Sequence, residues 1–376
     1  MLNVEKDALI IANGFNNHYI DVGEKLATSI QNDSNAQEEN LNINTNHQLL
    51  AFEPVTDEEV TRVINQLKSK QTTGPDGISS ITLKKISEHI VKPIRHLINL
   101  SFKMGEFPKE FKRAVVKPIF KNGDRTEISN YRPISLVNNL NKVIETCIKS
   151  RLVKYLESNN ILSQKQFGFR KNRGTQDTLT DLTKTVYDNL NKNNKVITVF
   201  LDLAKCFDSL SHEILIKKIT EIGIGADALK LCKSYLRERT QFVKVAEAVS
   251  SEKYIKFGTP QGTLLGPILF LIFINSFCNI QLENGEITTY ADDTVITFYG
   301  ANLREVFDFA NTGLNRLKRH LDRDLLSINY DKSKYILFGF KSIIVPPELT
   351  LQMHKTHNVE HCDCPEIKQT LNIWES

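Results

Sequence analysis

The chain has 376 residues, 40% of them hydrophobic and 24% charged, a balance typical of a soluble globular protein with about two or three domain-sized cores. Its net charge of +4 is compatible with a nucleic-acid partner but too small to indicate one, and its six scattered cysteines argue against a disulfide-stapled secreted domain. The N-terminus lacks a signal-peptide pattern and the longest apolar run, Leu264 to Ile274, is too short to cross a bilayer, so we expect an intracellular protein, nuclear or cytoplasmic, with no membrane partner.

The first part of the chain alternates helical patterns with one hairpin. Residues 1–30 carry an amphipathic helical pattern, and residues 31–47, rich in Asn, Gln and acidic side chains, favour a flexible linker. The segment Thr56-Asp57-Glu58-Glu59 is a typical helix start, and Gly74-Pro75-Asp76-Gly77 is a turn signal. In chain order, the patterns predict helices at 56–70 and 80–104, a strand at 114–120, a turn at 122–124 and a returning strand at 131–136.

The rest of the chain mixes helices with short strands. Residues 196–203 form a near-continuous apolar and β-branched run, which favours a buried central strand. Residues 288–299 favour a hairpin with Asp292 and Asp293 at its tip. The other predicted elements are helices at 138–158, 175–194, 211–222, 226–238, 264–277 and 303–325, a strand pair at 242–245 and 254–257, and a short strand at 335–340. This order predicts an α+β fold with an antiparallel sheet.

Three carboxylates stand at the ends of predicted strands. Asp202 ends an apolar strand, where a carboxylate needs a cation or an open cleft, although it could instead cap the segment that follows. Asp292 and Asp293 lie between two β-branched runs and could form a plain turn, but like charges at a turn repel unless a cation joins them. Hard oxygen ligands select Mg²⁺, so these residues favour a two-metal site.

Two further segments have the composition of ligand-binding loops. The segment Gly258-Thr259-Pro260-Gln261-Gly262 precedes a long apolar helix, and its glycines let backbone approach a ligand closely, although the segment taken alone is better explained as a flexible connecting loop. The hairpin around residues 117–135 presents Lys121 and Arg132, which could bind a triphosphate or could simply be solvated surface cations.

The order of these segments resembles that of reverse transcriptases. Over about residues 50–340, the chain is similar to the non-LTR retrotransposon branch, the LINE-type, jockey-like elements of animals. The matching segments are Gly74-Pro75-Asp76-Gly77-Ile78, Asn130-Tyr131-Arg132-Pro133-Ile134-Ser135-Leu136, Gln166-Phe167-Gly168-Phe169-Arg170, residues 200–208, residues 258–267, Tyr290-Ala291-Asp292-Asp293 and Asn329-Tyr330-Asp331-Lys332-Ser333-Lys334.

The resemblance implies a right-hand polymerase fold with fingers and palm subdomains and an antiparallel palm sheet. We expect an N-terminal helical segment and linker at 1–50, a reverse transcriptase domain at 51–345 and a truncated tail at 346–376. Relatives carry an endonuclease before this domain and a helical thumb after it, for which the chain has little room, so we expect a truncated copy with the thumb largely missing and a weak grip on primer and template.

The implied reaction is RNA-directed DNA synthesis, in which a primer 3′-hydroxyl attacks a deoxynucleoside triphosphate on an RNA template. By resemblance, the metal-binding and catalytic residues are Asp202, Asp292 and Asp293, with two Mg²⁺ ions or alternatively Mn²⁺, and Lys332 is a general acid. The implied nucleotide-binding residues are Lys121, Arg132, Phe207, Gln261 and Gly262, with Phe207 as a sugar gate. The implied nucleic-acid-binding residues are Phe169, Arg170, Lys171 and Arg173.

A purely structural or surface role is an alternative for several of these residues. Phe207 could be a core side chain, Lys332 a surface lysine, and residues 169–173 a solvated charge run. The cluster of His354, His357, His361, Cys362 and Cys364 could bind zinc, although its spacing favours a plain loop. An inactive remnant that only binds nucleic acid, and a two-metal nuclease, are rival functions. The sequence does not indicate the oligomeric state or the target site.

Overall fold

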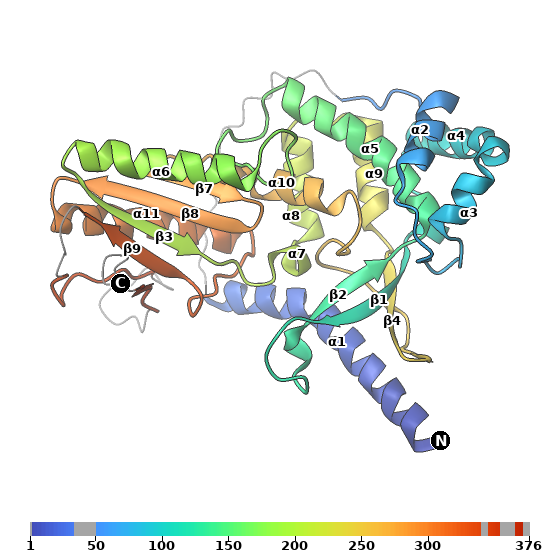
Figure 1. The fold of residues 1–376 in the computed structure, drawn as a ribbon, viewed down its shortest axis with the longest axis horizontal. Coiled ribbons are helices and arrows are strands. Elements are labelled where there is room, and N and C mark those ends of the chain that lie inside the picture. The colour runs from blue at the N-terminus through green and yellow to red at the C-terminus, as the bar shows by residue number, and fades with distance from the viewer. Residues whose placement is uncertain (1, 34–49, 340–344, 354–364, 371–376) are drawn as a thin grey trace. The chain divides into compact units, whose positions relative to one another are not determined.

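The structure, a computed structural model, describes residues 2–33, 50–339, 345–353 and 365–370 (Figure 1). The chain forms two compact units, each built from separate stretches of sequence. Unit 1 contains Met1–Lys25, Leu41–Ile161 and Phe207–Ile272, and unit 2 contains Leu26–Asn40, Leu162–Cys206 and Phe273–Ser376. The units follow packing and not chain order, so the domain boundaries at residues 50 and 345 remain a prediction.

Unit 1 combines a helical cluster with a small sheet. Its helices are α2 (Asp57–Gln66), α3 (Ser80–Lys85), α4 (Ser87–Met104), α5 (Asn139–Ser158), α8 (His212–Glu221) and α9 (Ala226–Leu236), and its strands are β1 (Arg113–Phe120), β2 (Tyr131–Leu136), β4 (Thr240–Val245), β5 (Ala248–Val249) and β6 (Lys253–Tyr254). Two short 3₁₀ turns lie at Lys109–Phe111 and Ile128–Asn130. Three helices run across the unit boundaries, namely α1 (Leu2–Asp33), α7 (Cys206–Ser209) and α10 (Gly266–Cys278).

The helix starts and stops of unit 1 follow local chemistry. The hydroxyl of Thr56 accepts a hydrogen bond from the backbone N–H of Glu59 at 3.2 Å, which caps α2 as its sequence predicts. The single helix expected at 80–104 is instead two helices, α3 and α4, separated at Ile86. Helical periodicity could not show this break, because both pieces keep an apolar face.

The unit 1 sheet has the order β2-β1-β4-β5, with β6 also paired to β4. β1 and β2 form the predicted antiparallel hairpin, from Val115↔Leu136 to Phe120↔Tyr131, whereas β1 and β4 run parallel. The predicted strand pair exists in part, because β4 pairs with β6 at residues 253–254 and not at 254–257. The N-terminal helix contributes Phe15 to a core cluster with Val116 and Val243.

Unit 2 is built on an antiparallel sheet. The strand order is β10 (Lys368–Gln369), β9 (Lys334–Phe338), β3 (Lys195–Leu201), β8 (Asp293–Gly300) and β7 (Gly285–Tyr290). Every pair is antiparallel except the short β10–β9 pair. The predicted buried strand is confirmed as β3, which lies between β9 and β8. The structure therefore has the expected α+β class and antiparallel sheet.

Two helices cover opposite faces of this sheet, as the side-chain alternation of its strands requires. On one face, α6 (Thr175–Asn191) packs Val186 and Leu190 against Val196 of β3. On the other face, α11 (Leu303–Arg323) packs Phe307 edge-on against Tyr335 of β9, with ring centroids 6.0 Å apart. The sheet is thus a rigid support whose strand ends can hold functional side chains.

Part of the predicted tail packs into unit 2. Leu351, Met353 and Ile367 are fully buried, and the backbone N–H of Ile367 donates to the carbonyl of Leu351 at 2.9 Å. Residues 368–369 then add β10 to the sheet. The histidines and cysteines considered for zinc, at positions 354, 357, 361, 362 and 364, lie outside the described residues.

Candidate active site

The three predicted carboxylates lie at one edge of the unit 2 sheet. The last pair between β3 and β8 is Leu201↔Thr294, so the next residues along these antiparallel strands, Asp202 and Asp293, face each other. Asp292 lies in the adjoining turn, because the hairpin closes at Tyr290↔Asp293. The predicted hairpin is therefore confirmed, with its turn at Ala291 and Asp292.

Electrostatics support the proximity of the three groups. Partial desolvation, and then the charges of Asp292 and Asp202, raise the pKa of the Asp293 carboxyl. Asp202 does not cap a helix, since α7 begins four residues later, at Cys206. Hard carboxylate oxygens are suitable ligands for a divalent cation. Within the described ranges, however, the structure contains no group of three His, Cys, Asp or Glu side chains that is arranged to hold a metal ion.

The turn that carries Asp292 is held by a buried amide. Gln166 is 1% exposed, and its side chain accepts from the backbone N–H of Ala291 at 3.0 Å and donates to the carbonyl of Ala291 at 3.2 Å. Ala291 has a φ of 58°, a left-handed conformation that a non-glycine residue adopts only when its surroundings fix it. Gln166 therefore supplies both hydrogen bonds that hold this strained turn.

The segment around Gln166 runs beside β7. The backbone N–H of Phe167 donates to the carbonyl of Thr289 at 2.9 Å, and the N–H of Thr289 donates to the carbonyl of Lys165 at 2.9 Å. Gly168 permits this approach, because a Cβ at that position would lie 2.1 Å from the backbone nitrogen of Ala291. Residue spacing alone did not predict that Gln166 holds this turn or that Gly168 permits the close approach.

A second loop fixes the strand end that carries Asp202. The backbone N–H of Asp202 donates to the hydroxyl of Ser333 at 3.1 Å, and its carbonyl accepts from the N–H of Asn329 at 2.8 Å. Ser333 is fully buried and also donates to the carbonyl of Asn329 at 2.8 Å. Lys332, the predicted general acid, is an exposed member of this loop and thus belongs to the segment that is bonded to Asp202.

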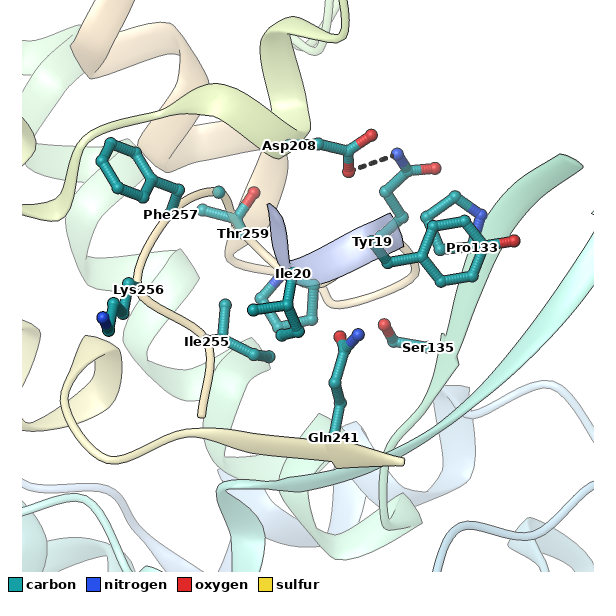
Figure 2. Close-up of a pocket in the computed structure, with 13 residues that line it drawn as sticks. Tyr19, Ile20, Pro133, Ser135, Asp208, Gln241, Ile255, Lys256, Phe257 and Thr259 are labelled. Atoms are coloured by element: carbon teal, nitrogen blue, oxygen red, sulfur yellow. Dashed lines mark hydrogen bonds between the residues drawn. The ribbon is translucent and has the colours of Figure 1, made fainter. Parts of the chain in front are cut away.

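In unit 1, the Pro-Gln-Gly loop is bonded to the segment that follows the Asp202 strand. The Gln261 side chain donates to the carboxylate of Asp208 at 2.8 Å. Both residues line a pocket of about 30 Å³, in which Figure 2 labels Asp208. The backbone N–H of Thr259 donates to the carbonyl of Phe207 at 3.0 Å. Gly258, with a φ of 77°, has no room for a Cβ, which would lie 2.7 Å from that carbonyl.

The other residues of this loop also have defined surroundings. The carbonyl of Gln261 accepts from the N–H of Ser135 on β2 at 2.8 Å, and Gly262 has a φ of 107°. Phe207 is half-buried and stacks on Phe270 with ring centroids 4.5 Å apart. These contacts position Gln261, Gly262 and Phe207, whereas their roles toward a nucleotide remain predictions.

The predicted basic hairpin presents its cations on one face. Ile119 pairs with Arg132, so strand alternation places Lys117, Ile119 and Lys121 on the same face as Arg132. Lys121 and Arg132 are both exposed, and neither makes an ion pair within the described part of the chain. Such a face can receive an anion.

Two arginines of the predicted nucleic-acid-binding loop make hydrogen bonds within the protein. Arg170 donates to the carbonyl of Ser163 at 2.6 Å, and Arg173 donates to the carbonyl of Gln164 at 2.6 Å. Phe169 is 47% exposed with a φ of 58°, and Lys171 is exposed. The two arginines hold the loop in shape, so a nucleic-acid contact there would depend chiefly on Phe169 and Lys171.

Comparisons with known proteins identify a family and relatives to which this chain is similar. A family model described as reverse transcriptase (RNA-dependent DNA polymerase) matches residues 119–363. The chain is 29% identical to the "Probable RNA-directed DNA polymerase from transposon BS" of Drosophila melanogaster, covering 78% of this chain and 33% of that protein. It is 30% identical to the RNA-directed DNA polymerase from mobile element jockey of Drosophila funebris, covering 77% and 32%.

The chain spans about a third of the length of these curated relatives. Among solved structures, apo telomerase from Candida tropicalis is similar with a TM-score of 0.47 and 16% identity, covering 62% of this chain and 51% of that one. In the described part of the chain, no helix combines the length and the apolar character needed to span a bilayer. The family match covers more than half of the residues, and with the jockey-type relatives it establishes that the chain belongs to the reverse transcriptase family, in its non-LTR, LINE-type branch.

Proposed function

We propose that this chain catalyses RNA-directed DNA synthesis, with a deoxynucleoside triphosphate, a DNA primer and an RNA template as its substrates. The observation that carries the proposal is the register of β3 and β8, which sets Asp202 opposite Asp293 beside the turn that bears Asp292. Desolvation, and then the charges of Asp292 and Asp202, raise the pKa of Asp293, so a bound cation would be stabilising at this edge.

In the proposed reaction, the primer 3′-hydroxyl attacks the α-phosphorus of the incoming nucleotide. A P–O bond forms to the primer, the bond to the β-phosphate oxygen breaks, and pyrophosphate leaves. Asp202, Asp292 and Asp293 would hold two Mg²⁺ ions, or Mn²⁺ instead, which activate the hydroxyl and neutralise the charge of the leaving group. The protein contributes position and charge and forms no covalent bond with the substrate.

The remaining predicted residues have supporting roles in this proposal. Lys121 and Arg132, on one face of the β1–β2 hairpin, would neutralise the triphosphate. Lys332, on the loop bonded to Asp202, would donate a proton to pyrophosphate. Phe207 would exclude the 2′-hydroxyl of a ribonucleotide. We also propose residues 51–345 as the fingers and palm of this catalytic domain.

Extension of a DNA primer on an RNA template, with dNTPs and Mg²⁺, tests the proposal. The Asp292→Ala, Asp293→Ala double variant should retain less than about one hundredth of the wild-type rate, because it removes two of three metal ligands. The matched control is Asp188→Ala, Asp308→Ala, which removes two exposed carboxylates of α6 and α11 and should extend like wild type. Equal extension by the wild type and the Asp292 variant would overturn the assignment.

A further inference from the structure

A basic groove in unit 1 has no role in the proposed chemistry. It lies between α2 and α5, encloses about 600 Å³ and is lined by Lys68, Lys70, Lys142 and Lys149, with no acidic side chain among its lining residues. This volume is within the range of about 300–1,000 Å³ typical of ligand-binding pockets. Since lysines and no acidic side chains line it, the groove is suited to an anionic ligand.

The four positive charges are compensated only in part, because Glu145 and Asp76 act on Lys142 alone. Lys68 and Lys70 are exposed, Lys142 and Lys149 are half-buried, and none of them makes an ion pair within the residues that the structure describes. Burial, the largest cause, and the neighbouring charge of Lys70 lower the pKa of Lys142, against the opposing effect of Glu145 and Asp76. A bound anion would relieve this repulsion.

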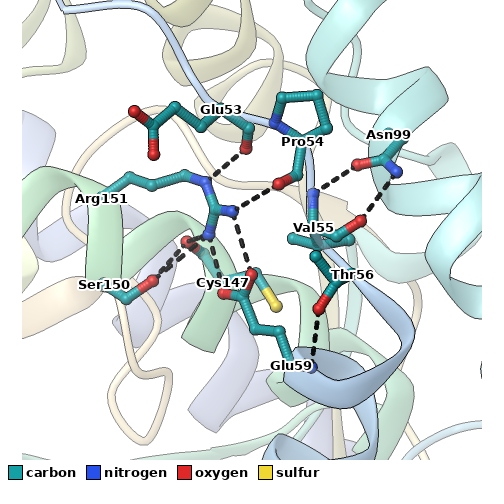
Figure 3. Close-up of polar contacts among 9 residues, drawn as sticks. All are labelled: Glu53, Pro54, Val55, Thr56, Glu59, Asn99, Cys147, Ser150 and Arg151. Carbon is teal, nitrogen blue, oxygen red and sulfur yellow. Dashed lines mark hydrogen bonds and ion pairs between the residues drawn. The ribbon is translucent and has the colours of Figure 1, made fainter.

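The walls of the groove are held in place before any ligand binds. Figure 3 shows Arg151 of α5 donating to both carboxylate oxygens of Glu59 on α2, at 2.8 and 3.0 Å, and to the carbonyl of Glu53 at 2.6 Å. On the opposite rim, the Ser80 hydroxyl donates to the carbonyl of Lys68 at 2.8 Å and accepts from the N–H of Lys70 at 3.0 Å. A groove fixed in this way loses little entropy on binding.

The placement of the lysines indicates an extended ligand and not a small one. Lys142 and Lys149 are seven residues apart on one helix, which corresponds to about 10 Å along its axis. A single phosphate could not reach all four amines, whereas a chain of phosphates could. The groove is also lined by the aliphatic side chains of Val63, Leu67, Val153 and Leu264, against which sugars and bases could lie.

One end of the groove adjoins the predicted nucleotide-binding loop. Leu264, a lining residue, follows Gln261 and Gly262 by two to three positions in the segment before α10. Its backbone N–H donates to the buried carboxylate of Glu145, at 2.7 Å, which fixes the segment on α5. We propose that the groove binds the phosphate backbone of a single-stranded RNA. That this strand is the template rests on the proposed function.

Binding of a fluorescent 12-nucleotide oligouridylate to the full chain, without dNTPs, tests the groove by anisotropy at several salt concentrations. Replacing the four lysines by glutamine should weaken binding at least about tenfold, and should reduce the slope of log Kd against log salt by about 2.8, since each contact with a single strand contributes about 0.7. The four-arginine variant should bind like wild type. The control, Lys→Gln at the exposed positions Lys92, Lys103, Lys109 and Lys217, should leave the slope unchanged.

The exposed pair Lys68→Gln, Lys70→Gln provides a second variant that does not disturb α5, and its slope should fall by about 1.4. Any of three results would overturn the inference: an unchanged slope in both variants, an equal change in the control, or equally lysine-dependent binding of an RNA duplex. Displacement of the RNA by tripolyphosphate at matched phosphate concentration would also overturn it, in favour of a small-anion site.

The same measurements separate this inference from the proposed function. The Asp292→Ala, Asp293→Ala variant should bind the oligouridylate like wild type, because its changes lie in unit 2. RNA binding that depends on the four lysines, without any primer extension, would support the groove proposal and contradict the proposed function. Normal primer extension, together with RNA binding that does not depend on these lysines, would contradict the groove proposal alone.

Discussion

At the residue scale, the surroundings of Asp293 disfavour the charged form of its carboxyl group. Desolvation and the charges of Asp292 and Asp202 raise its pKa, so the folded chain binds this proton more tightly than the unfolded chain, whose aspartate titrates near about 3.9. The ionised carboxylate therefore destabilises the fold at pH values above the folded pKa, and this cost disappears as the pH falls below the unfolded value. A residue that opposes stability in this way is common at functional sites.

We expect Asp293→Asn to raise the Tm in metal-free buffer at pH 7.5, on the order of 1 °C, because it removes a repelled charge. The difference should shrink as the pH falls and Asp293 in the wild type becomes protonated. Added Mg²⁺ should stabilise the wild type more than the variant. Thermal unfolding followed by circular dichroism measures all three, and a lower Tm for the variant at pH 7.5 without metal would contradict the electrostatic account.

Gln166 holds the turn that bears Asp292 through two hydrogen bonds to Ala291. Replacing it with alanine leaves the N–H and carbonyl of Ala291 without their partners, in a turn that already has a left-handed residue. We expect Gln166→Ala to lower kcat by about tenfold, which corresponds to about 1.4 kcal/mol, and to raise the Mg²⁺ concentration needed for half-maximal rate.

Gln166→Glu is the informative comparison for this prediction. A carboxylate can still accept from the N–H of Ala291 but cannot donate to its carbonyl, and it adds a negative charge near the aspartates. The Mg²⁺ requirement should therefore change differently in the two variants, with the KM for primer–template unchanged in both. A uniform loss of activity that follows the loss of folded protein, with the Mg²⁺ requirement of wild type, would show a purely structural role.

At the scale of elements, the connection between α2 and α5 depends on one buried ion pair. The side chains of Arg151 and Glu59 are 12% and 17% exposed, and the guanidinium also donates to the backbone carbonyls of Glu53 and Pro54 (Figure 3). Removing one member of a buried pair leaves the other charge desolvated, which costs far more than breaking a surface pair.

We expect Arg151→Ala to lower the free energy of unfolding by about 3 kcal/mol in urea titrations. Arg95→Ala is a matched control, because its ion pair with Asp57 on α2 has side chains 42% and 40% exposed, and should cost less than about 1 kcal/mol. Equal losses in the two variants would mean that burial does not decide the energy of the Arg151 pair. The Arg151 variant should also weaken RNA binding, since the groove would lose a fixed wall.

At the scale of the whole molecule, residues beyond 345 contribute to the core of unit 2. Leu351 is fully buried, and Asn311 of α11 donates to the carbonyl of Thr350 at 3.0 Å while its side-chain oxygen accepts from the N–H of Gln352 at 3.0 Å. Residues 350–352 therefore pack against α11, beyond the predicted boundary at residue 345.

We expect Leu351→Ala to destabilise the protein by about 2–5 kcal/mol, the usual cost of a cavity in a core, and a chain that ends at Val345 to lose more. The control Glu348→Ala changes an exposed side chain three residues beyond Val345 and should have little effect. Urea unfolding followed by near-UV circular dichroism measures each. An unaltered midpoint for Leu351→Ala would show that this segment does not pack as described.

Local chemistry was sufficient to predict much of the fold. The α2 start follows from Thr56 and the acidic residues after it, and the buried strand β3 follows from an unbroken β-branched run. Interruptions within a helical pattern were not predictable: the break at Ile86 leaves both flanking periodicities intact. Short strands such as β6 and β10 are also invisible to pattern, because two residues carry no period.

Residue types and their order along the chain were sufficient to recognise the family and to predict the three aspartates as its metal-binding residues, because such motifs are local in sequence. Only the tertiary structure identified Gln166, Ser333 and the lysine groove. Gln166 lies 125 residues from the turn it holds, and Ser333 lies 131 residues from Asp202. Hydrogen bonds and charge clusters of this kind arise when distant segments pack together, and nothing in local propensity or periodicity encodes their partners.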